Sequence, residues 1–249
     1  MRPIQRRQQG LQYGLYLLCM QAMNFGIDRI PPATLIGVIV QALLYTGVIQ
    51  VPWNAEDVCI SAVKIFKYRD WRSFIVSNFE HGSDMHLYYN MLSFILKGSY
   101  LELMYGTTNF VILLALLSFG CSAMYVSLAY VLMQLTGDYG YYTMCAIGFS
   151  SVLFALKVIT VCEEHDRSHD IGGLRVPSKI AVWVELALIH LLVPNSSFMG
   201  HLGGILVGCL YCYTFVGELV DNLICMITGI PVIHEEQFYR RRGMGFRVH

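Results

Sequence analysis

Charged side chains are scarce in this sequence. Only 14% of its 249 residues are Asp, Glu, Lys or Arg, whereas 55% are hydrophobic, and the mean hydropathy is +0.52. Soluble domains carry about 25% charged residues. The deficit falls in long uncharged runs, which predicts an integral membrane protein. The formal net charge is zero, so the sequence lacks the basic surface that a nucleic-acid partner requires.

A recognisable signal peptide is also missing. The start, MRPIQRRQQG, is basic, but polar residues interrupt the apolar stretch that follows it. We interpret the cysteines as small buried hydrophobes: Cys19, Cys59, Cys121, Cys145, Cys162, Cys209, Cys212 and Cys225. Cys209 and Cys212 form a C-x-x-C without a second pair, so we expect no metal and no other cofactor.

Apolar runs of about 20 residues, the length that crosses the hydrocarbon core, predict an all-α polytopic membrane protein with six transmembrane helices. The expected spans are Ala33–Val51, Met85–Tyr105, Phe110–Leu135, Tyr142–Val161, Ile180–Val193 and Phe198–Val220. Leu11–Ile27 contains several polar residues and is interpreted as a helix at the membrane interface, with a seventh crossing as the alternative.

The spans define three regions. We expect an amino-terminal cytosolic or interfacial segment (1–32), a six-span domain (33–220) and a short cytosolic tail (221–249). Within the domain, residues 52–84 form a folded, partly helical loop outside the membrane.

Basic residues indicate the orientation, because cytosolic connections carry an excess of Lys and Arg. One face collects Arg2, Arg6, Arg7, Arg29, Arg167, Arg175, Lys179, Arg240, Arg241, Arg242 and Arg247, and the other only Lys64, Lys67, Arg69 and Arg72. Both termini are therefore expected in the cytosol. The loops 52–84, 136–141 and 194–197 are expected on the lumenal or outer face.

Polar residues near the starts of three spans are expected at one depth. His86 and Asn90 begin the second span, Ser150 and Ser151 the fourth, and His201 the sixth. All three spans run inward from the non-cytosolic face. Polar groups within a bilayer are costly and tend to face one another or a water-filled cavity, so this convergence predicts a site.

A serine and a histidine suggest nucleophilic catalysis. A serine hydroxyl attacks a carbonyl when a base takes its proton, and neutral imidazole is the usual base. His201 lies within a stripe of small residues, Gly200, Gly204 and Gly208, that is expected to face Ala155 of the fourth span. Small residues at this spacing let two helices approach closely. A glycine-rich packing seam that carries a structural histidine is the alternative.

His86 and Asn90 share a helix face at i and i+4, and both can donate hydrogen bonds to an oxyanion. The alternative is a pair that ties the helix to the loop. Gly148 precedes Ser150 by two residues, so backbone amides near the serine are expected to face an incoming carbonyl. No Asp or Glu is placed to orient His201, which predicts a serine–histidine dyad.

Together these motifs resemble the rhomboid intramembrane serine proteases. The resemblance rests on Gly148-Phe-Ser150, on His201 among glycines, on His86-x-x-x-Asn90, on Trp71-Arg72, and on Leu101-Glu102-Leu-Met-Tyr-Gly106. It covers about residues 33–220 in family order. It implies a rhomboid fold and proteolysis of membrane-protein substrates within or next to their membrane helix.

The resemblance also implies a role for each matched residue. Ser150 would be the nucleophile and His201 its base, with His86, Asn90 and the Ser150 amide around the oxyanion. Phe154 would pack on His201. Three further residues would support the fold: Trp71, Arg72 and Glu102. Ser151 replaces a glycine of the family pattern and should point away from His201.

Residues 152–157 and Trp183-Val-Glu185 look most like the endoplasmic-reticulum rhomboid linked to degradation of membrane proteins. That subclass implies ubiquitin-linked machinery and its AAA ATPase as partners. Arg240-Arg-Arg242 is faintly like an ATPase-binding motif, with a simple topology anchor as the alternative.

Three other functions remain. An inactive rhomboid relative that binds and escorts membrane clients would need neither the serine nor the histidine. A membrane-bound acyltransferase using His201 and Asn90 would leave Ser150 unused. A transporter would be expected to show an inverted repeat.

Overall fold

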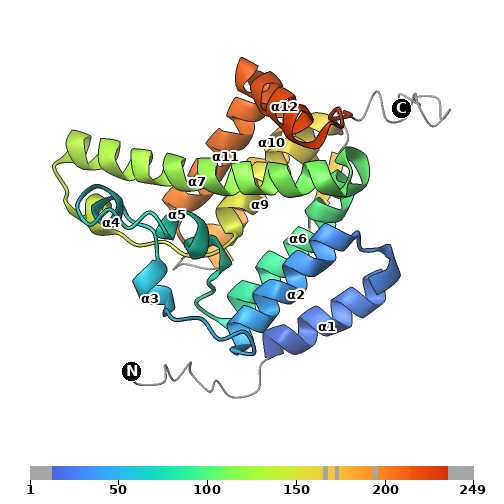
Figure 1. Ribbon diagram of the computed structural model, residues 1–249, viewed down its shortest axis with the longest axis horizontal. Coiled ribbons are helices and arrows are strands. Elements are labelled where there is room, and N and C mark those ends of the chain that lie inside the picture. The colour runs from blue at the N-terminus through green and yellow to red at the C-terminus, as the bar shows by residue number, and fades with distance from the viewer. Residues whose placement is uncertain (1–12, 165–167, 172–173, 193–195, 235–249) are drawn as a thin grey trace.

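The protein is a bundle of helices (Figure 1), and the computed structural model describes residues 13–164, 168–171, 174–192 and 196–234. The elements are α1 (Tyr13–Phe25), η1 (Ile27–Arg29), α2 (Pro32–Thr46), α3 (Ala55–Val58), α4 (Ala62–Phe66), α5 (Ser73–Val76), η2 (Ser77–Phe79), α6 (Asp84–Tyr105), α7 (Thr107–Thr136), α8 (Gly140–Thr143), α9 (Ser150–Glu163), β1 (Ser168–Ile171), β2 (Leu174–Pro177), α10 (Ser178–Leu192), α11 (Phe198–Tyr213) and α12 (Phe215–Thr228). The helical membrane fold expected from the sequence is confirmed, with one small antiparallel hairpin, β1–β2, added to it.

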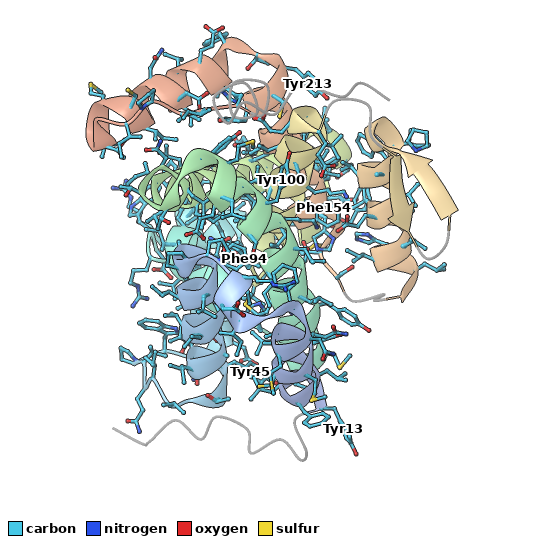
Figure 2. All side chains as sticks on the ribbon, turned by 90° about the vertical axis from the view of Figure 1, so that its right-hand side faces the viewer. Tyr13, Tyr45, Phe94, Tyr100, Phe154 and Tyr213 are labelled. Atoms are coloured by element: carbon cyan, nitrogen blue, oxygen red, sulfur yellow. A yellow bond between two sulfur atoms is a disulfide. The ribbon has the colours of Figure 1, made fainter. Side chains whose placement is uncertain are left out.

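Helix α9 occupies the centre of the bundle. Every residue from 152 to 161 is buried, and α6, α7, α10 and α11 pack around it. A helix that is apolar on all sides is stable only when protein or lipid covers it. In Figure 2, Phe94 and Phe154 lie inside the molecule, while Tyr13 and Tyr213 lie at opposite ends of it.

Length and hydropathy mark α7 as the one described helix that meets the requirements for crossing a bilayer alone, with a hydropathy of 2.1. Helices α11 and α12 meet them only as a pair, bent by 82°. The apolar helices Pro32–Thr46 and Ile180–Leu191 are shorter. The number of spans therefore stays a prediction.

Two predicted span boundaries are wrong. The fourth helix begins at Ser150 rather than Tyr142, because Ile60 and Ala146 form a backbone bridge and Gly148 takes a φ of +113°. The sixth breaks at Thr214, which is extended. The Thr214 hydroxyl accepts a hydrogen bond from the Val216 amide at 3.2 Å and so caps α12.

The first predicted span is also too long, since α2 ends at Thr46 and Gly47 takes a left-handed conformation. Pro32 begins this helix, where its fixed φ and missing N–H suit the first helical position. The other predicted spans agree with α6, α7 and α10 to within a few residues.

Helix α1 lies lengthwise against α6 rather than across the bundle at a membrane surface (Figure 1). The Gly14 amide donates to Asp84 at the start of α6 (3.0 Å). Helix α2 then begins at the other end of α6, where Glu102 accepts from the Thr34 amide (2.7 Å). Helix α1 thus runs beside α6 in the same direction, and both the interfacial position and the seventh crossing stay predictions.

The 52–84 loop is folded and partly helical, as predicted, and a disulfide ties it to the segment before α9. Cys59 and Cys145 are bonded across 86 residues of sequence, next to the bridge between Ile60 and Ala146. Interpreting these two cysteines as buried hydrophobes was wrong. Cys59 lies in the predicted 52–84 loop and Cys145 near the outer start of the predicted fourth span, so their position on one predicted face was the available signal.

A polar cluster joins the segment after α12 to the ends of three core helices. His234 contacts Glu163 of α9 at 2.6 Å through Nδ1 and Asp221 of α12 at 3.0 Å through Nε2. Tyr105 of α6 donates to Glu163, and Tyr211 of α11 donates to Asp221, both at 2.6 Å. These bonds hold α12 against the bundle.

Several sequence-based assignments lie outside the described residues. They are the basic positions before residue 13, Arg167, and the arginine-rich segment 239–246.

Candidate active site

Ser150 and His201 meet where α9 and α11 begin. The His201 Nε2 lies 2.9 Å from the Ser150 Oγ, and only 3% of the His201 surface is exposed. The two residues are 51 positions apart in sequence. The pair that the sequence singled out is therefore in hydrogen-bonding contact, the arrangement in which imidazole can take a serine proton.

Glycines of α11 make this contact possible. A Cβ on Gly204 would overlap the carbonyl oxygen of Ser151, and one on Gly208 would lie 2.9 Å from the carbonyl oxygen of Ala155. Any larger residue at either position would push the two helices apart. The close approach expected between Gly208 and Ala155 is confirmed.

Two rings pack against the His201 imidazole. The Phe154 ring, one turn after Ser150, lies 4.7 Å from it between centroids. The His190 ring of α10 lies 5.2 Å away at an interplanar angle of 75°. Phe154 is where the sequence places it, whereas His190 was missed because nothing in its surroundings on α10 resembles a motif.

Gly148 brings the backbone against His86. Its φ of +113° is unfavourable for any other residue, and a Cβ there would lie 2.9 Å from His86 Nε2 and 3.6 Å from Asn90 Nδ2. The Gly148 amide donates to the Ser77 carbonyl at 2.8 Å. The Gly148 amide is therefore occupied, and the role of the Ser150 amide beside an incoming carbonyl stays a prediction.

His86 and Asn90 present donors beside Ser150. The Gly82 amide donates to His86 Nδ1 at 3.4 Å, so in the neutral ring Nε2 carries the hydrogen. The Asn90 Nδ2 is buried and has no hydrogen-bond partner in the described residues. Two such donors suit a developing negative charge.

A cavity of about 490 Å³ opens onto these groups. Its lining includes Met85, His86, Asn90, Ser150, Phe154 and His201. Lys97 and Glu185 lie at its wall and form an ion pair between α6 and α10, with Nζ and Oε1 2.7 Å apart. Sequence analysis did not identify Lys97, since a lone lysine on an apolar helix gives no indication of its partner.

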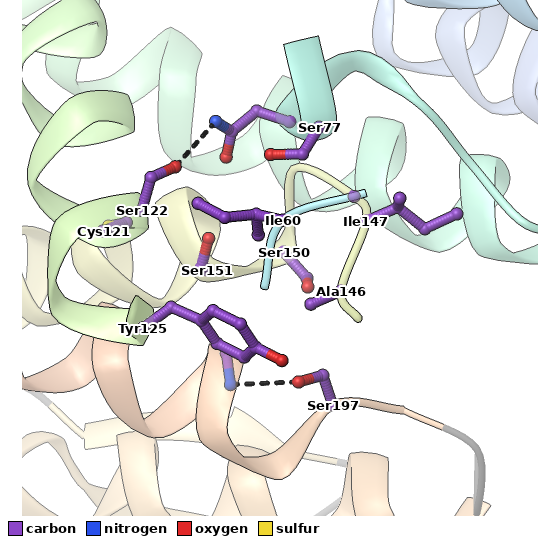
Figure 3. A pocket seen from close by; sticks show the side chains of 13 residues that line it. Ile60, Ser77, Cys121, Ser122, Tyr125, Ala146, Ile147, Ser150, Ser151 and Ser197 are labelled. Atoms are coloured by element: carbon purple, nitrogen blue, oxygen red, sulfur yellow. Dashed lines mark hydrogen bonds between the residues drawn. The ribbon is translucent and has the colours of Figure 1, made fainter. Parts of the chain in front are cut away.

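A second, small cavity of about 20 Å³ lies on the loop side of Ser150 (Figure 3). Ser77, Ser151, Tyr125 and Ser197 are among its lining residues. Ser150 lines both cavities, whereas Ser151 lines the small one and His201 the large one. The two adjacent serines thus differ in surroundings.

The residues expected to support the fold differ in burial and in hydrogen bonding. Glu102 is buried, and its carboxylate accepts hydrogen bonds from the Ala33 amide (2.8 Å) and from Thr34, so it caps the start of α2. It also accepts a hydrogen bond from the Thr107 hydroxyl (2.8 Å). Trp71 is 62% exposed.

Arg72 pairs with Asp70 at 2.9 Å, and its side chain is 72% exposed. This pair lowers the pKa of Asp70. A solvent-exposed pair of this kind contributes little to stability, because water screens the charges.

His81 lies behind His86 and was not identified from sequence. Their ring centroids are 5.1 Å apart, and His81 is buried. Burial, together with the neighbouring His86, holds the pKa of His81 well below its ordinary value. His81 is therefore uncharged at neutral pH. Within the described part of the chain, no three His, Cys, Asp or Glu residues are grouped to hold a metal ion.

The fold and this site define the class of protein. Residues 68–218 match the Rhomboid domain, and the chain belongs to the rhomboid family. It is 37% identical over 232 residues to Rhomboid-related protein 4 of Mus musculus, which covers 93% of this chain and 71% of that protein. It is 37% identical over 208 residues to Rhomboid-related protein 4 of Homo sapiens, with 84% and 65% covered.

A plant relative is similar to the same extent. Rhomboid-like protein 14, mitochondrial, of Arabidopsis thaliana is 36% identical over 210 residues, covering 83% of this chain and 63% of that protein. The chain thus spans about two thirds of the length of these relatives.

Proposed function

We propose that this chain is an intramembrane serine endopeptidase that uses Ser150 as nucleophile and His201 as base. The observation that carries the proposal is the 2.9 Å contact between His201 Nε2 and Ser150 Oγ at the wall of a large cavity. Membership of the rhomboid family supports it.

In the acylation step, His201 Nε2 accepts the Ser150 proton while Oγ attacks the carbonyl carbon of the substrate. The carbonyl oxygen becomes negative and accepts hydrogen bonds from His86 Nε2 and Asn90 Nδ2. Protonated His201 then gives the proton to the departing amine, and the peptide C–N bond breaks. Ser150 is left as an ester of the amino-terminal fragment.

Deacylation needs water inside a membrane protein. The small cavity lies between the 52–84 loop and Ser150, and its volume of about 20 Å³ is sufficient for one water molecule. The attacking water must reach the large cavity, which His201 lines together with Ser150. There His201 takes a proton from the water, the hydroxide attacks the ester carbonyl, and the Ser150 oxygen departs with the proton returned by His201.

Membrane helices that are easily unwound are the proposed substrates. An intact helix hides its carbonyls in intrahelical hydrogen bonds, so small and helix-breaking residues should favour cleavage. Entry beside α10 fits its position at the cavity wall, where Glu185 is held by Lys97. The cut should fall in the part of the substrate helix nearest the disulfide face.

The proposed location is the endoplasmic reticulum, with degradation of membrane proteins as the process served. The Cys59–Cys145 disulfide supports it, because disulfides persist in oxidising compartments such as the lumen. The segment after α12 would be cytosolic, where ubiquitin-linked machinery and an AAA ATPase could act on released fragments. Resistance of the disulfide to reduction in isolated microsomes, and its loss after detergent, would test this placement.

An inactive client-binding protein is the alternative. It is favoured by Ser151, which adds a side chain beside the site where the family pattern has glycine. Under this alternative the cavity would hold membrane helices without cutting them.

Cleavage by the purified chain separates the two functions. The chain is reconstituted in liposomes with a transmembrane substrate that carries a Gly-Pro pair near one end, and with a polyleucine version. We expect cleavage of the first, little of the second, and none with Ser150→Ala. Binding of substrate without cleavage by the unmodified chain would establish the alternative.

A further inference from the structure

The second nitrogen of His201 lacks a partner. Nε2 contacts the Ser150 hydroxyl and must be unprotonated to accept its proton, so Nδ1 carries the hydrogen. His201 Nδ1 is buried and makes no hydrogen bond to the described residues. Buried donors are nearly always paired, and in a catalytic triad this hydrogen is held by a carboxylate.

His190 presents the complementary atom. Its Nδ1 lies 2.9 Å from the Leu186 carbonyl oxygen, which can only accept, so Nδ1 carries the hydrogen. Its Nε2 is therefore an acceptor, and it too is buried with no partner among the described residues. A donor without an acceptor and an acceptor without a donor thus lie on neighbouring rings.

The separation of the two rings suits a hydrogen bond. Their centroids are 5.2 Å apart, and each ring nitrogen lies roughly 1 Å from its centroid, so facing nitrogens come within about 3 Å, an ordinary hydrogen-bond distance. Phe198 packs against His190 with centroids 5.1 Å apart and limits how far the ring can move. The two nitrogens are not hydrogen-bonded to each other in this structure, so the bond requires a small shift of one ring toward the other.

Glu185, the carboxylate on the same helix, is engaged elsewhere. It lies 2.7 Å from Lys97 Nζ and 3.8 Å from Lys157 Nζ. It is also more than one helical turn from His190 along α10. Among the described residues, an imidazole and not a carboxylate therefore lies at the back of His201.

We propose that His190 is a positioning residue for His201, with its Nε2 accepting the hydrogen of His201 Nδ1. This inference rests on the proposed protease function. The bond keeps His201 in the tautomer that can accept the Ser150 proton, and it stabilises the imidazolium that forms. No proton moves to His190. Because His190 belongs to α10, movement of α10 away from the bundle would also loosen the base.

Two substitutions at His190 test the bond. His190→Phe keeps a planar ring but removes the acceptor, whereas His190→Gln keeps an acceptor oxygen at similar reach. Cleavage in liposomes gives kcat and KM, and fluorophosphonate labelling gives the reactivity of Ser150 without a substrate helix. Leu191→Phe, at an exposed neighbouring position on α10, controls for a phenylalanine in this helix.

We expect His190→Phe to lower kcat and the labelling rate by about tenfold or more, below the roughly 10⁴-fold effect at a triad carboxylate. KM should stay within about twofold, because the substrate cavity is unchanged. His190→Gln should recover most of the rate, and Leu191→Phe should match the unmodified chain.

Unchanged kcat and labelling in His190→Phe would overturn the inference. So would equal losses in His190→Phe and His190→Gln with equally lowered thermal stability, since that result describes packing alone. If the unmodified chain neither cleaves nor labels at Ser150, the proposed function itself fails, and this inference falls with it.

Discussion

The amide of Gly14 donates a hydrogen bond to the carboxylate of Asp84, 3.0 Å away. This contact places the start of α1 beside the start of α6, on the face where the disulfide lies. A Cβ on Gly14 would overlap the Asp84 carbonyl oxygen, so the two helices meet closely there. Helix α1 therefore runs along the first part of α6.

The first prediction concerns topology. A tag placed before Tyr13 should be protected from protease in sealed microsomes, whereas a tag after His249 should be digested. The reason is the shared direction of α1 and α6. Both tags digested would restore the interfacial helix and the two cytosolic termini expected from basic residues alone.

The second prediction concerns the nucleophile. Ser150→Ala should abolish fluorophosphonate labelling, because the Ser150 Oγ is the hydroxyl that contacts His201. Ser151→Ala should keep it, since the Ser151 side chain lines the other cavity. Labelling that survives the first substitution and disappears in the second would reverse the assignment.

The third prediction concerns the oxyanion. His86→Ala and Asn90→Ala should each lower kcat by about 10²–10³, the usual effect of losing one oxyanion donor. The melting temperature of Asn90→Ala should change little, because Asn90 Nδ2 makes no hydrogen bond to the described residues. A rate near that of the unmodified chain in Asn90→Ala would limit this residue to helix packing.

The fourth prediction concerns the glycine contact between α9 and α11. Gly204→Ala should lower both the melting temperature and the activity, because its Cβ would overlap the Ser151 carbonyl. Gly120→Ala is the matched control on α7, where the nearest atom would lie at an ordinary 3.5 Å. Similar melting temperatures for the two variants would mean that the helices do not meet as described.

The fifth prediction concerns pH and the polar cluster at His234. Hydrogen bonds to Asp221 and Glu163 raise the pKa of His234 to about 10. Because the pKa of His234 is higher in the folded chain, the protonated ring stabilises the fold. This stabilisation is complete below the ordinary pKa of about 6.5 and is lost as pH rises through about 10. Tyr105 also faces the ring, with centroids 5.8 Å apart.

His234→Gln removes this titration. The unmodified chain should exceed the variant in melting temperature at about pH 6, and the difference should vanish by about pH 11. The difference in melting temperature should be modest, since 42% of the His234 side chain is exposed and water screens exposed ion pairs. A difference that is independent of pH would show that packing alone holds the segment.

Most of the candidate site could be predicted from the sequence. Ser150, His201, His86 and Asn90 are polar residues in apolar surroundings, and such residues are rare enough in a membrane protein to stand out. Gly204 and Gly208 could be predicted because glycine every fourth residue has a direct geometric meaning.

The contacts of His190, Lys97 and the Cys59–Cys145 pair could be found only in the tertiary structure. Each joins positions far apart along the chain or on separate helices, and hydropathy and spacing describe one segment at a time. A histidine or lysine on an apolar helix has the same local pattern whether it meets a partner or lipid.

By itself, the sequence determined the class of the protein, the approximate helices and the Ser150–His201 pair. The tertiary structure decided where those helices end, that α1 lies beside α6, and that the Gly148 amide is occupied by Ser77. The physical reason is that composition and periodicity report which surfaces must be buried. Which groups bury them, and at what angle, depends on packing and hydrogen bonds between distant segments.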